Sequence, residues 1–288
     1  MIVVTGATGK LGRQIVLELL KLTGPQQIAA SVRNPSKAAD LAARGVRLRR
    51  GDFEDSASLA NAFEGATQLL LISSNASASG QDPIAQHRNA IEAARTAGVQ
   101  RIVYTSHMGA SASSVFPLMH DHATTEALLA ESGIAWTALR NGFYASTVPM
   151  LIGDAASSGA IEAPQDGPVA WTTHADLAAT AARILIDGGS FNGPTPPLTG
   201  GEASDLDAVA AILSEQTGRT IERRTIADEE QGRRLAQYGL PPAVVDITLA
   251  IYRAARAGEF AATDPTLARL IGRVPVSLRD VLARSSDG

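Results

Sequence analysis

A glycine-rich segment near the start of the chain is the first feature whose residue types and spacing could do chemistry. It reads Thr5-Gly6-Ala7-Thr8-Gly9-Lys10-Leu11-Gly12 and separates an apolar run from an amphipathic pattern. Glycines between a strand and a helix permit a tight turn, a close backbone approach to a pyrophosphate and close helix packing. The start of such a helix also presents free amide groups to an anion. We therefore expect a dinucleotide site that includes Gly6, Thr8, Gly9, Lys10, Leu11 and Gly12, with a purely structural turn as the alternative.

Two cations follow the second apolar run. Arg33 stands at its end and Lys37 four residues later, and no acidic residue occurs between Leu22 and Lys37. A site for NAD would place Asp or Glu here to bind the ribose 2′-hydroxyl, whereas the 2′-phosphate of NADP needs a cation and suits a guanidinium best. The segment therefore predicts NADP(H), bound by Arg33 and Lys37, although Lys37 could equally be a solvated surface charge.

Two further pairs of residues stand where apolar runs end. Asp52 and Phe53 follow the third run, and Ser73 and Ser74 follow the fourth. Ligands of parallel α/β sheets bind at the carboxyl ends of the strands. We expect the first pair to meet the adenine and the second pair to lie near the phosphates and the nicotinamide ribose.

The elements that must position these residues alternate regularly in the first half of the chain. Apolar runs typical of buried parallel strands alternate with patterns in which apolar residues recur three and four positions apart. The expected strands are 2–5, 28–32, 46–49, 68–72, 101–104 and 136–139, and the expected helices are 11–22, 35–44, 56–63, 83–97 and 120–132. Right-handed crossovers would join them into a Rossmann-like α/β fold, a doubly wound parallel sheet.

After about residue 150 the rhythm changes to pieces punctuated by Gly and Pro, with helical patterns at 175–186, 205–216, 243–257 and 277–283. We expect residues 1–150 to form the NADP(H)-binding domain and residues 151–288 a smaller C-terminal α/β lobe that binds substrate, with some exchange of chain between the two.

The amino-acid composition argues against several classes of binding partner. The chain of 288 residues has a formal net charge of -4, and it has no cysteine that could form a disulfide or a thiolate metal site. Its Lys and Arg residues are scattered, so nucleic acid is a poor candidate partner. The first expected strand begins at Ile2, and no run of about 18 apolar residues occurs. We expect a cytoplasmic protein with a small-molecule partner, no membrane or nucleic-acid partner and no metal; the oligomeric state is open.

Several of these segments together resemble the NmrA-like atypical short-chain dehydrogenase/reductases, in their quinone oxidoreductase and triphenylmethane reductase branch. The resemblance is carried by the glycine segment, Arg33-Asn34-x-x-Lys37, Gly51-Asp52, residues 102–106, His122-x-x-Thr125-Glu126 and residues 137–144. It implies NADP(H) binding, a small C-terminal lobe over the nicotinamide and reduction of quinone-like or conjugated acceptors.

One feature of the larger dehydrogenase superfamily is missing. Its Tyr-x-x-x-Lys pair gives or takes a proton beside the hydride. Taking Glu126 as the landmark, the lysine position is His122 and the tyrosine position is Leu118. Reduction of an ordinary ketone needs a proton, whereas a quinone yields a stabilised phenolate and a delocalised carbocation needs no proton. The missing pair therefore favours acceptors of the latter kinds. His122 could bind the nicotinamide ribose or act as a weak acid, with a helix-surface histidine that has no chemical task as the alternative.

The remaining candidates lie at the ends of the fifth and sixth expected strands. Ser106 and His107 follow the fifth strand, where either could orient the acceptor or simply cap a loop. Asn141, Phe143 and Tyr144 follow the sixth and could line the acceptor pocket, with core packing as the alternative for the aromatic residues. We assign His122, Ser106 and Tyr144 as candidate catalytic residues, and His107, Asn141 and Phe143 as substrate residues.

Two functions fit these features. The first is an NADPH-dependent oxidoreductase that transfers hydride to a quinone-like or conjugated small molecule without the Tyr-Lys relay. The second is an NADP(H)-binding regulatory protein that senses redox state with little or no catalysis. We favour the enzyme because the segment beyond Met150 is long enough to build a pocket.

Overall fold

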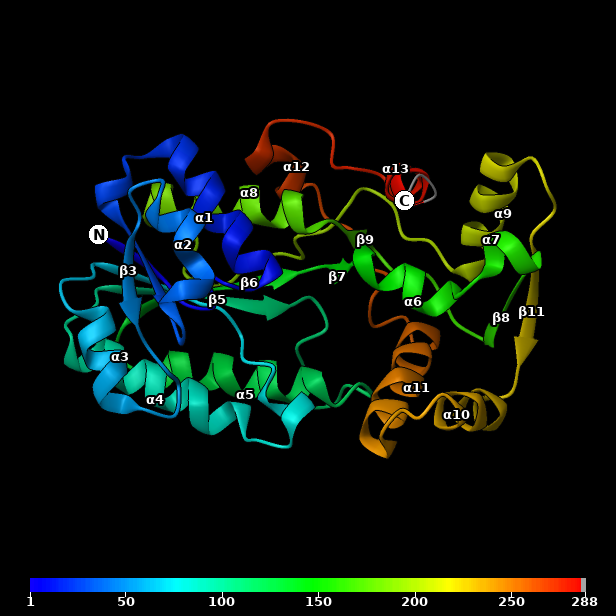
Figure 1. Cartoon of the computed structure of the whole chain (residues 1–288), viewed down its shortest axis with the longest axis horizontal. Coiled ribbons are helices and arrows are strands. Elements are labelled where there is room, and N and C mark those ends of the chain that lie inside the picture. The colour runs from blue at the N-terminus through cyan, green and yellow to red at the C-terminus, as the bar shows by residue number, and fades with distance from the viewer. Residues whose placement is uncertain (286–288) are drawn as a thin grey trace.

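Seven parallel strands form the central sheet of the computed structural model, which describes residues 1–285 (Figure 1). Their spatial order is β10-β6-β5-β4-β1-β2-β3. The strands are β1 (Ile2–Val4), β2 (Ile28–Val32), β3 (Arg47–Arg50), β4 (Gln68–Leu71), β5 (Arg101–His107), β6 (Ala135–Asn141) and β10 (Gly193–Pro194). The first six in sequence have the doubly wound order, and the order reverses between β1 and β4. The predicted α/β fold is therefore confirmed.

Helices cover both faces of the sheet, as the near-continuous apolar character of its strands requires. On one face α1 (Lys10–Leu22) packs against α8 (His174–Asp187), and on the other lie α3 (Ser56–Phe63), α4 (Pro83–Thr96) and α5 (Leu118–Glu131). Alternate residues of each strand enter the two cores, so that Leu70 packs on the α1 side and Leu71 on the α4 side. Because of this alternation, the position of a residue in its strand determines whether its side chain points to the helices on one face of the sheet or on the other.

The structure differs from the sequence prediction in two places that matter for the site. The fifth and sixth strands run on to His107 and Asn141, so both residues belong to paired strands rather than to loops. The helix expected over 35–44 is a 3-10 turn, Pro35–Ala38, and a short helix α2, Ala39–Ala42. The side chain of Asn34 accepts a hydrogen bond from the Ser36 amide and so favours a turn there over a regular helix.

A second lobe follows the sixth strand. Two small parallel pairs, β7 (Phe143–Tyr144) with β9 (Trp171–Thr172) and β8 (Ala160–Pro164) with β11 (Glu222–Ile226), combine with seven helices of the described chain. These helices are α6 (Val148–Ile152), α7 (Ala155–Ser158), α9 (Leu206–Thr217), α10 (Asp228–Gln237), α11 (Pro242–Arg256), α12 (Thr266–Ile271) and α13 (Leu278–Ser285). The lobe has its own core, which includes Trp171, Tyr252 and Phe260.

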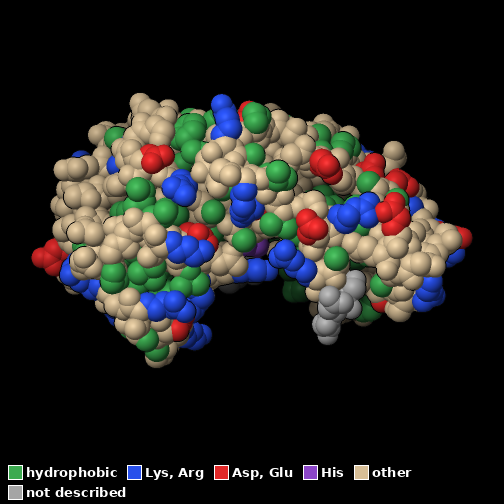
Figure 2. All heavy atoms as spheres, turned by 90° about the horizontal axis from the view of Figure 1, so that it is seen from above, with side chains coloured by type: hydrophobic (Ala, Val, Ile, Leu, Met, Phe, Trp, Pro, Cys, Tyr) green, Lys and Arg blue, Asp and Glu red, His purple; other side chains and the backbone are tan. Residues whose placement is uncertain are grey.

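The chain passes between the two lobes several times. Strand β10 pairs with β6 in the main sheet, α8 packs on α1, and α12 packs on α8. Buried Asp176 of α8 accepts a hydrogen bond from the Val276 amide at 2.9 Å and pairs with Arg273, which ties the segment before α13 to α8. Figure 2 shows the surface hollowed between the two lobes, with Lys and Arg side chains beside the hollow.

Within residues 1–285, no helix is long and apolar enough to cross a membrane. The same residues contain no group of three or more His, Asp or Glu side chains that could hold a metal ion.

Candidate active site

The glycine turn connects β1 to α1 at the point where the strand order reverses. Gly6 has a φ of +58°, which favours glycine, and its carbonyl accepts a hydrogen bond from the Gly9 amide at 2.9 Å. A Cβ at Gly12 would clash with the Gly6 carbonyl oxygen, so this glycine lets the helix approach the turn. Gly9 is the N-cap of α1 without a side-chain cap, and no acidic residue occupies the first helical turn. The helix therefore begins with amide groups that an anion can bind.

A cavity of about 640 Å³ lies beside this turn and is bounded by the ends of β1, β2, β3 and β4. Eight of the residues that we predicted to bind the cofactor line it: Gly6, Thr8, Gly9, Arg33, Asp52, Phe53, Ser73 and Ser74. A crevice at the carboxyl ends of parallel strands, where their order reverses, is the expected ligand site of a doubly wound sheet.

The other four predicted cofactor residues do not line the cavity. Leu11 is buried in the core on the α1 side, and Gly12 serves the packing described above. Lys10 is exposed at the start of α1, close enough to His174 for its charge to help lower that residue's pKa. Lys37 is exposed, and its backbone carbonyl accepts a hydrogen bond from Arg13 at 2.8 Å.

Arg33 is the cation that the cavity contains. Its side chain is exposed at the end of β2, and it makes no hydrogen bond or ion pair with any residue in the described part of the chain. The nearby Arg13 is already paired with Asp40. The guanidinium of Arg33 is thus available to a phosphate, and a planar guanidinium can bind two phosphate oxygens at once.

The wall of the cavity at the end of β4 is fixed by side chains from three other elements. The backbone amides of residues 72, 73 and 74 donate hydrogen bonds to Thr5 Oγ1 at 2.9 Å, Thr105 Oγ1 at 2.8 Å and His87 Nε2 at 2.8 Å. The Ser74 hydroxyl donates to Gln86 Oε1 at 2.5 Å. The roles of Thr105 and His87 could not be predicted from sequence, because a threonine in a strand and a histidine in a helix carry no signal of a contact so distant in sequence.

His122 lies on α5 beside a buried tyrosine. The hydroxyl of Tyr104, fully buried on β5, is 2.9 Å from His122 Nδ1. Burial raises the pKa of Tyr104 and lowers the pKa of His122 to about 4. His122 is therefore a neutral imidazole at neutral pH, able to bind and orient but carrying no extra proton to donate.

The side chain of Ser106 points to the face of the sheet that α5 covers. It is buried, and its hydroxyl donates a hydrogen bond to Glu126 Oε1 at 2.6 Å. Arg140 binds the same carboxylate through two nitrogens, at 3.2 Å and 2.8 Å. The Ser106 hydroxyl is thus part of a partly buried ion-pair network between β5, α5 and β6, and it does not line the cavity described above.

The substrate residues that we predicted lie together at the ends of β5 and β6. The rings of His107 and Phe143 pack edge to face with centroids 5.4 Å apart, and Phe260 of the second lobe packs on Phe143 at 5.0 Å. Phe143 is 8% exposed, so in this structure it belongs to an aromatic core. Burial lowers the pKa of His107 to about 3. Asn141 is 2% exposed, and its Oδ1 has no hydrogen-bond partner among the described residues.

The ring of Tyr144 packs against the ring of His174. The two ring centroids lie 4.3 Å apart, where β7 meets the start of α8. Burial raises the pKa of Tyr144 to about 12, and burial together with the charge of Lys10 lowers the pKa of His174 to about 4. Tyr144 therefore keeps its phenolic proton and can donate a hydrogen bond, but it is a weak acid.

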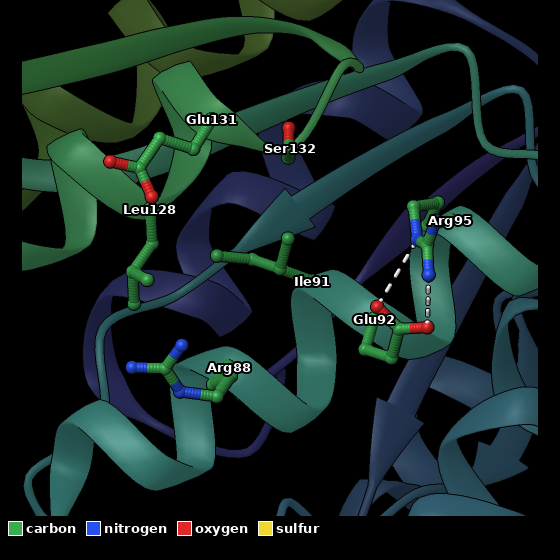
Figure 3. A pocket seen from close by; sticks show the side chains of 7 residues that line it. All are labelled: Arg88, Ile91, Glu92, Arg95, Leu128, Glu131 and Ser132. Atoms are coloured by element: carbon green, nitrogen blue, oxygen red, sulfur yellow. Dashed lines mark hydrogen bonds and ion pairs between the residues drawn. The ribbon is translucent and has the colours of Figure 1, made fainter.

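Two other hollows contain none of the predicted site residues. One of about 240 Å³ lies between α4 and α5, where Figure 3 shows Ile91 and Leu128 between charged side chains, with Glu92 paired to Arg95 at 2.7 Å. The other, of about 520 Å³, lies beside the edge strand β3. Neither is bounded by the glycine turn or by the end of β4.

The doubly wound sheet, the glycine turn and the cavity between them define a dinucleotide-binding α/β protein. The family model described as NAD(P)H-binding matches residues 6–187, and the chain belongs to this family. It is similar to quinone oxidoreductase 2 of Escherichia coli (strain K12), with 39% identity over 281 residues, covering 97% of this chain and 96% of that protein.

Two solved structures are similar over the whole chain. The NADPH complex of the Escherichia coli NADPH-dependent quinone oxidoreductase has a TM-score of 0.92 and 37% identity, covering 99% of this chain and 100% of that chain. The NADP(H) complex of the Citrobacter sp. triphenylmethane reductase has a TM-score of 0.89 and 36% identity, with the same coverage of 99% and 100%.

Proposed function

We propose that the protein is an NADPH-dependent oxidoreductase that transfers hydride to a quinone-like or otherwise conjugated small molecule. The observation that carries the proposal is the cavity at the glycine turn with the unpaired guanidinium of Arg33 inside it. Full-length relatives named for NADPH-dependent quinone reduction and for triphenylmethane reduction support the choice of acceptor class.

The residues present fit NADP(H). Gly6, Thr8 and Gly9 line the cavity beside the uncapped first amides of α1, where a diphosphate would bind. Arg33 would hold the 2′-phosphate, Asp52 and Phe53 the adenine side, and Ser73 and Ser74 the ribose and phosphates. Lys10, which lies outside the cavity, would serve the nicotinamide end, and Lys37 a peripheral electrostatic role.

The proposed reaction requires little proton transfer by the protein. When bound, the dihydronicotinamide supplies the hydride, and the protein must orient it and exclude water. Neutral His122, held by Tyr104, would orient the nicotinamide ribose as a hydrogen-bond partner. Tyr144, Asn141 and His107 would face the acceptor, whereas we now propose that Ser106 positions α5 through Glu126. No residue in this set supplies a proton as readily as a Tyr-Lys pair.

Stopped-flow absorbance at the nicotinamide band tests this proposal. Quinones and cationic triphenylmethane dyes should oxidise NADPH in the presence of the protein, and simple ketones of similar size should not. If NADPH is oxidised no faster with the protein than in buffer, for every acceptor tried, the proposed reductase activity is refuted.

The alternative of a redox-sensing regulatory protein gains no support from the relatives reported above, whose names describe reductases. A sensor would prefer one redox form of the cofactor strongly and retain a protein partner. The proposed partner here is a small-molecule acceptor, and a cytoplasmic location is part of the proposal.

A further inference from the structure

We propose that His87, a buried residue of α4, is a positioning residue for the cofactor, and that it acts by holding the backbone of Ser74 in the cavity wall. The proposal rests on the proposed function only in taking NADPH as the ligand of that cavity. His87 itself does not line the cavity. It would therefore act through Ser74 and not by contact with the cofactor.

The contacts of His87 are fully specified. It is 1% exposed, its Nε2 accepts a hydrogen bond from the Ser74 amide at 2.8 Å, and its Nδ1 lies 2.8 Å from Thr125 Oγ1. The Thr125 hydroxyl donates its own proton to the Asp121 carbonyl at 2.8 Å, as threonine in a helix often does. Thr125 is also fully buried, so the interaction is shielded from water.

These partners allow one protonation state of the imidazole. Because Nε2 accepts from an amide, it carries no proton, and the proton of the neutral ring must lie on Nδ1. Thr125 Oγ1 has used its proton on Asp121 and accepts this one. Thr125 thus fixes the tautomer that His87 needs in order to bind Ser74.

The site of action is the cavity wall just beyond the end of β4. Ser74 follows the end of β4, and its neighbours at 72 and 73 are held by Thr5, just after β1, and by Thr105 of β5. At Ser74 the support changes to α4, where His87 binds the amide and the adjacent Gln86 binds the hydroxyl. Loss of His87 would leave the part-buried Ser74 amide without this partner, and the wall would have to move to give it another.

The ring of Tyr104 packs edge to face on His87 with centroids 5.4 Å apart. Since Tyr104 also binds His122, substitutions at His87 must be compared on cofactor binding and on turnover separately. We expect the main effect on NADPH affinity, because Ser74 lines the cavity whereas the Tyr104 contact with His87 is a packing contact.

The test compares two substitutions of His87 in the full-length protein, with NADPH affinity measured by calorimetry. His87→Leu removes the acceptor and should raise the Kd for NADPH about tenfold to a hundredfold, as the loss of one buried hydrogen bond and the movement it causes would do. His87→Gln can place its amide oxygen near Nε2 and should keep the Kd within about threefold of wild type. The KM for NADPH should follow the Kd, with kcat and the KM for acceptor changed less.

Thr125→Val removes the partner that sets the tautomer and should also weaken NADPH binding. Thr180→Val is its matched control, because Thr180 is equally buried and donates to the Asp176 carbonyl at 2.8 Å, but on α8 and away from the cavity wall. If His87→Leu does not fold, the comparison of Thr125→Val with Thr180→Val tests the proposal instead.

Equal NADPH affinity of the two threonine variants, or of folded His87→Leu and wild type, would overturn the positioning role. Equal weakening by His87→Leu and His87→Gln would do so as well. Failure of the wild-type protein to bind NADPH would instead reject the proposed function, so the two outcomes are distinguishable.

Discussion

The hydroxyl of Tyr104 lies 2.9 Å from Nδ1 of His122, and the pair joins the fifth strand to the helix that follows it. Burial keeps the phenol protonated and the imidazole uncharged near neutral pH. The resemblance implies that His122 stands at the lysine position of the larger superfamily, and its ring is neutral and held by Tyr104. This favours acceptors that need no proton from the protein.

Activity should accordingly show no ionisation of His122 near neutral pH. Because burial lowers its pKa to about 4, kcat should be flat between about pH 6 and 8. Tyr104→Phe, which frees the ring to rotate, should lower kcat/KM by about tenfold, the equivalent of one hydrogen bond. A pH-rate profile with an inflection near 6.5 that disappears in His122→Ala would contradict this assignment.

Reversal of charge at Arg33 should abolish the preference for NADPH. Arg33→Glu places a carboxylate where the 2′-phosphate is expected, and the loss of a charge-assisted interaction should raise the Kd for NADPH by about a hundredfold or more. The Kd for NADH, which lacks this phosphate, should change little. Calorimetry with both coenzymes measures the ratio directly.

Lys37→Glu is the matched control for Arg33→Glu. Both residues are exposed, but only Arg33 lines the cavity. The lysine variant should shift the ratio of the two affinities by less than about threefold, the effect of one screened surface charge. A larger effect at Lys37 than at Arg33 would assign the 2′-phosphate to the lysine instead.

Substitution of Gly12 should damage both stability and cofactor binding. The added methyl of Gly12→Ala would clash with the Gly6 carbonyl oxygen and push α1 away from the turn, at a cost of about 1–3 kcal/mol in the free energy of unfolding. Gly189→Ala meets no atom within 4 Å and serves as the control. Denaturant unfolding and NADPH titration of both variants would test this, and an unchanged Gly12→Ala protein would refute the packing role.

Acid should destabilise the protein through its buried histidines. The pKa of His87 and His107 falls to about 3, and that of His122 and His174 to about 4, mainly because each is buried. Below pH 6.5 the unfolded chain takes up protons that the folded protein does not, so the free energy of unfolding falls as the pH falls. At pH 5 His87 alone should account for about 2 kcal/mol.

Denaturant unfolding at pH 7.5 and pH 5 measures this loss. His87→Gln cannot take up the proton in either state, so its loss of stability between the two pH values should be smaller than that of wild type by about 2 kcal/mol. An identical loss in both proteins would show that His87 is protonated in the folded state.

The order of the main elements could be predicted from sequence because buried parallel strands are short apolar runs and their helices carry an apolar stripe. In the second lobe the helical patterns at 205–216, 243–257 and 277–283 match α9, α11 and α13, but the short strands and α10 carry neither signal. Strands β7 and β9 have two residues each, too few for any periodicity, and α10 has no buried residue to mark a stripe. The seventh strand of the sheet, Gly193–Pro194, consists of two residues that normally indicate a turn.

At the candidate site, residues marked by a local sequence signal could be predicted, whereas contacts between residues far apart in the sequence could not. The glycine turn and Arg33 could be located because a ligand site at strand ends places residues by their position in the chain. The partner of Ser106 could not, because Glu126 is brought to it by helix packing, and the same holds for His87 at Ser74. A hydroxyl that sequence suggests for catalysis can thus be committed to an ion pair.

The repeated passage of the chain between the lobes has a consequence for dissection of the protein. A fragment that ends at residue 150 would lack α8, whose Leu177, Leu185 and Ala181 pack in the core shared with α1. Its sheet would also lose the strand that covers the outer edge of β6. Limited proteolysis should therefore yield no autonomous cofactor-binding half, and heating should melt both lobes in a single cooperative transition.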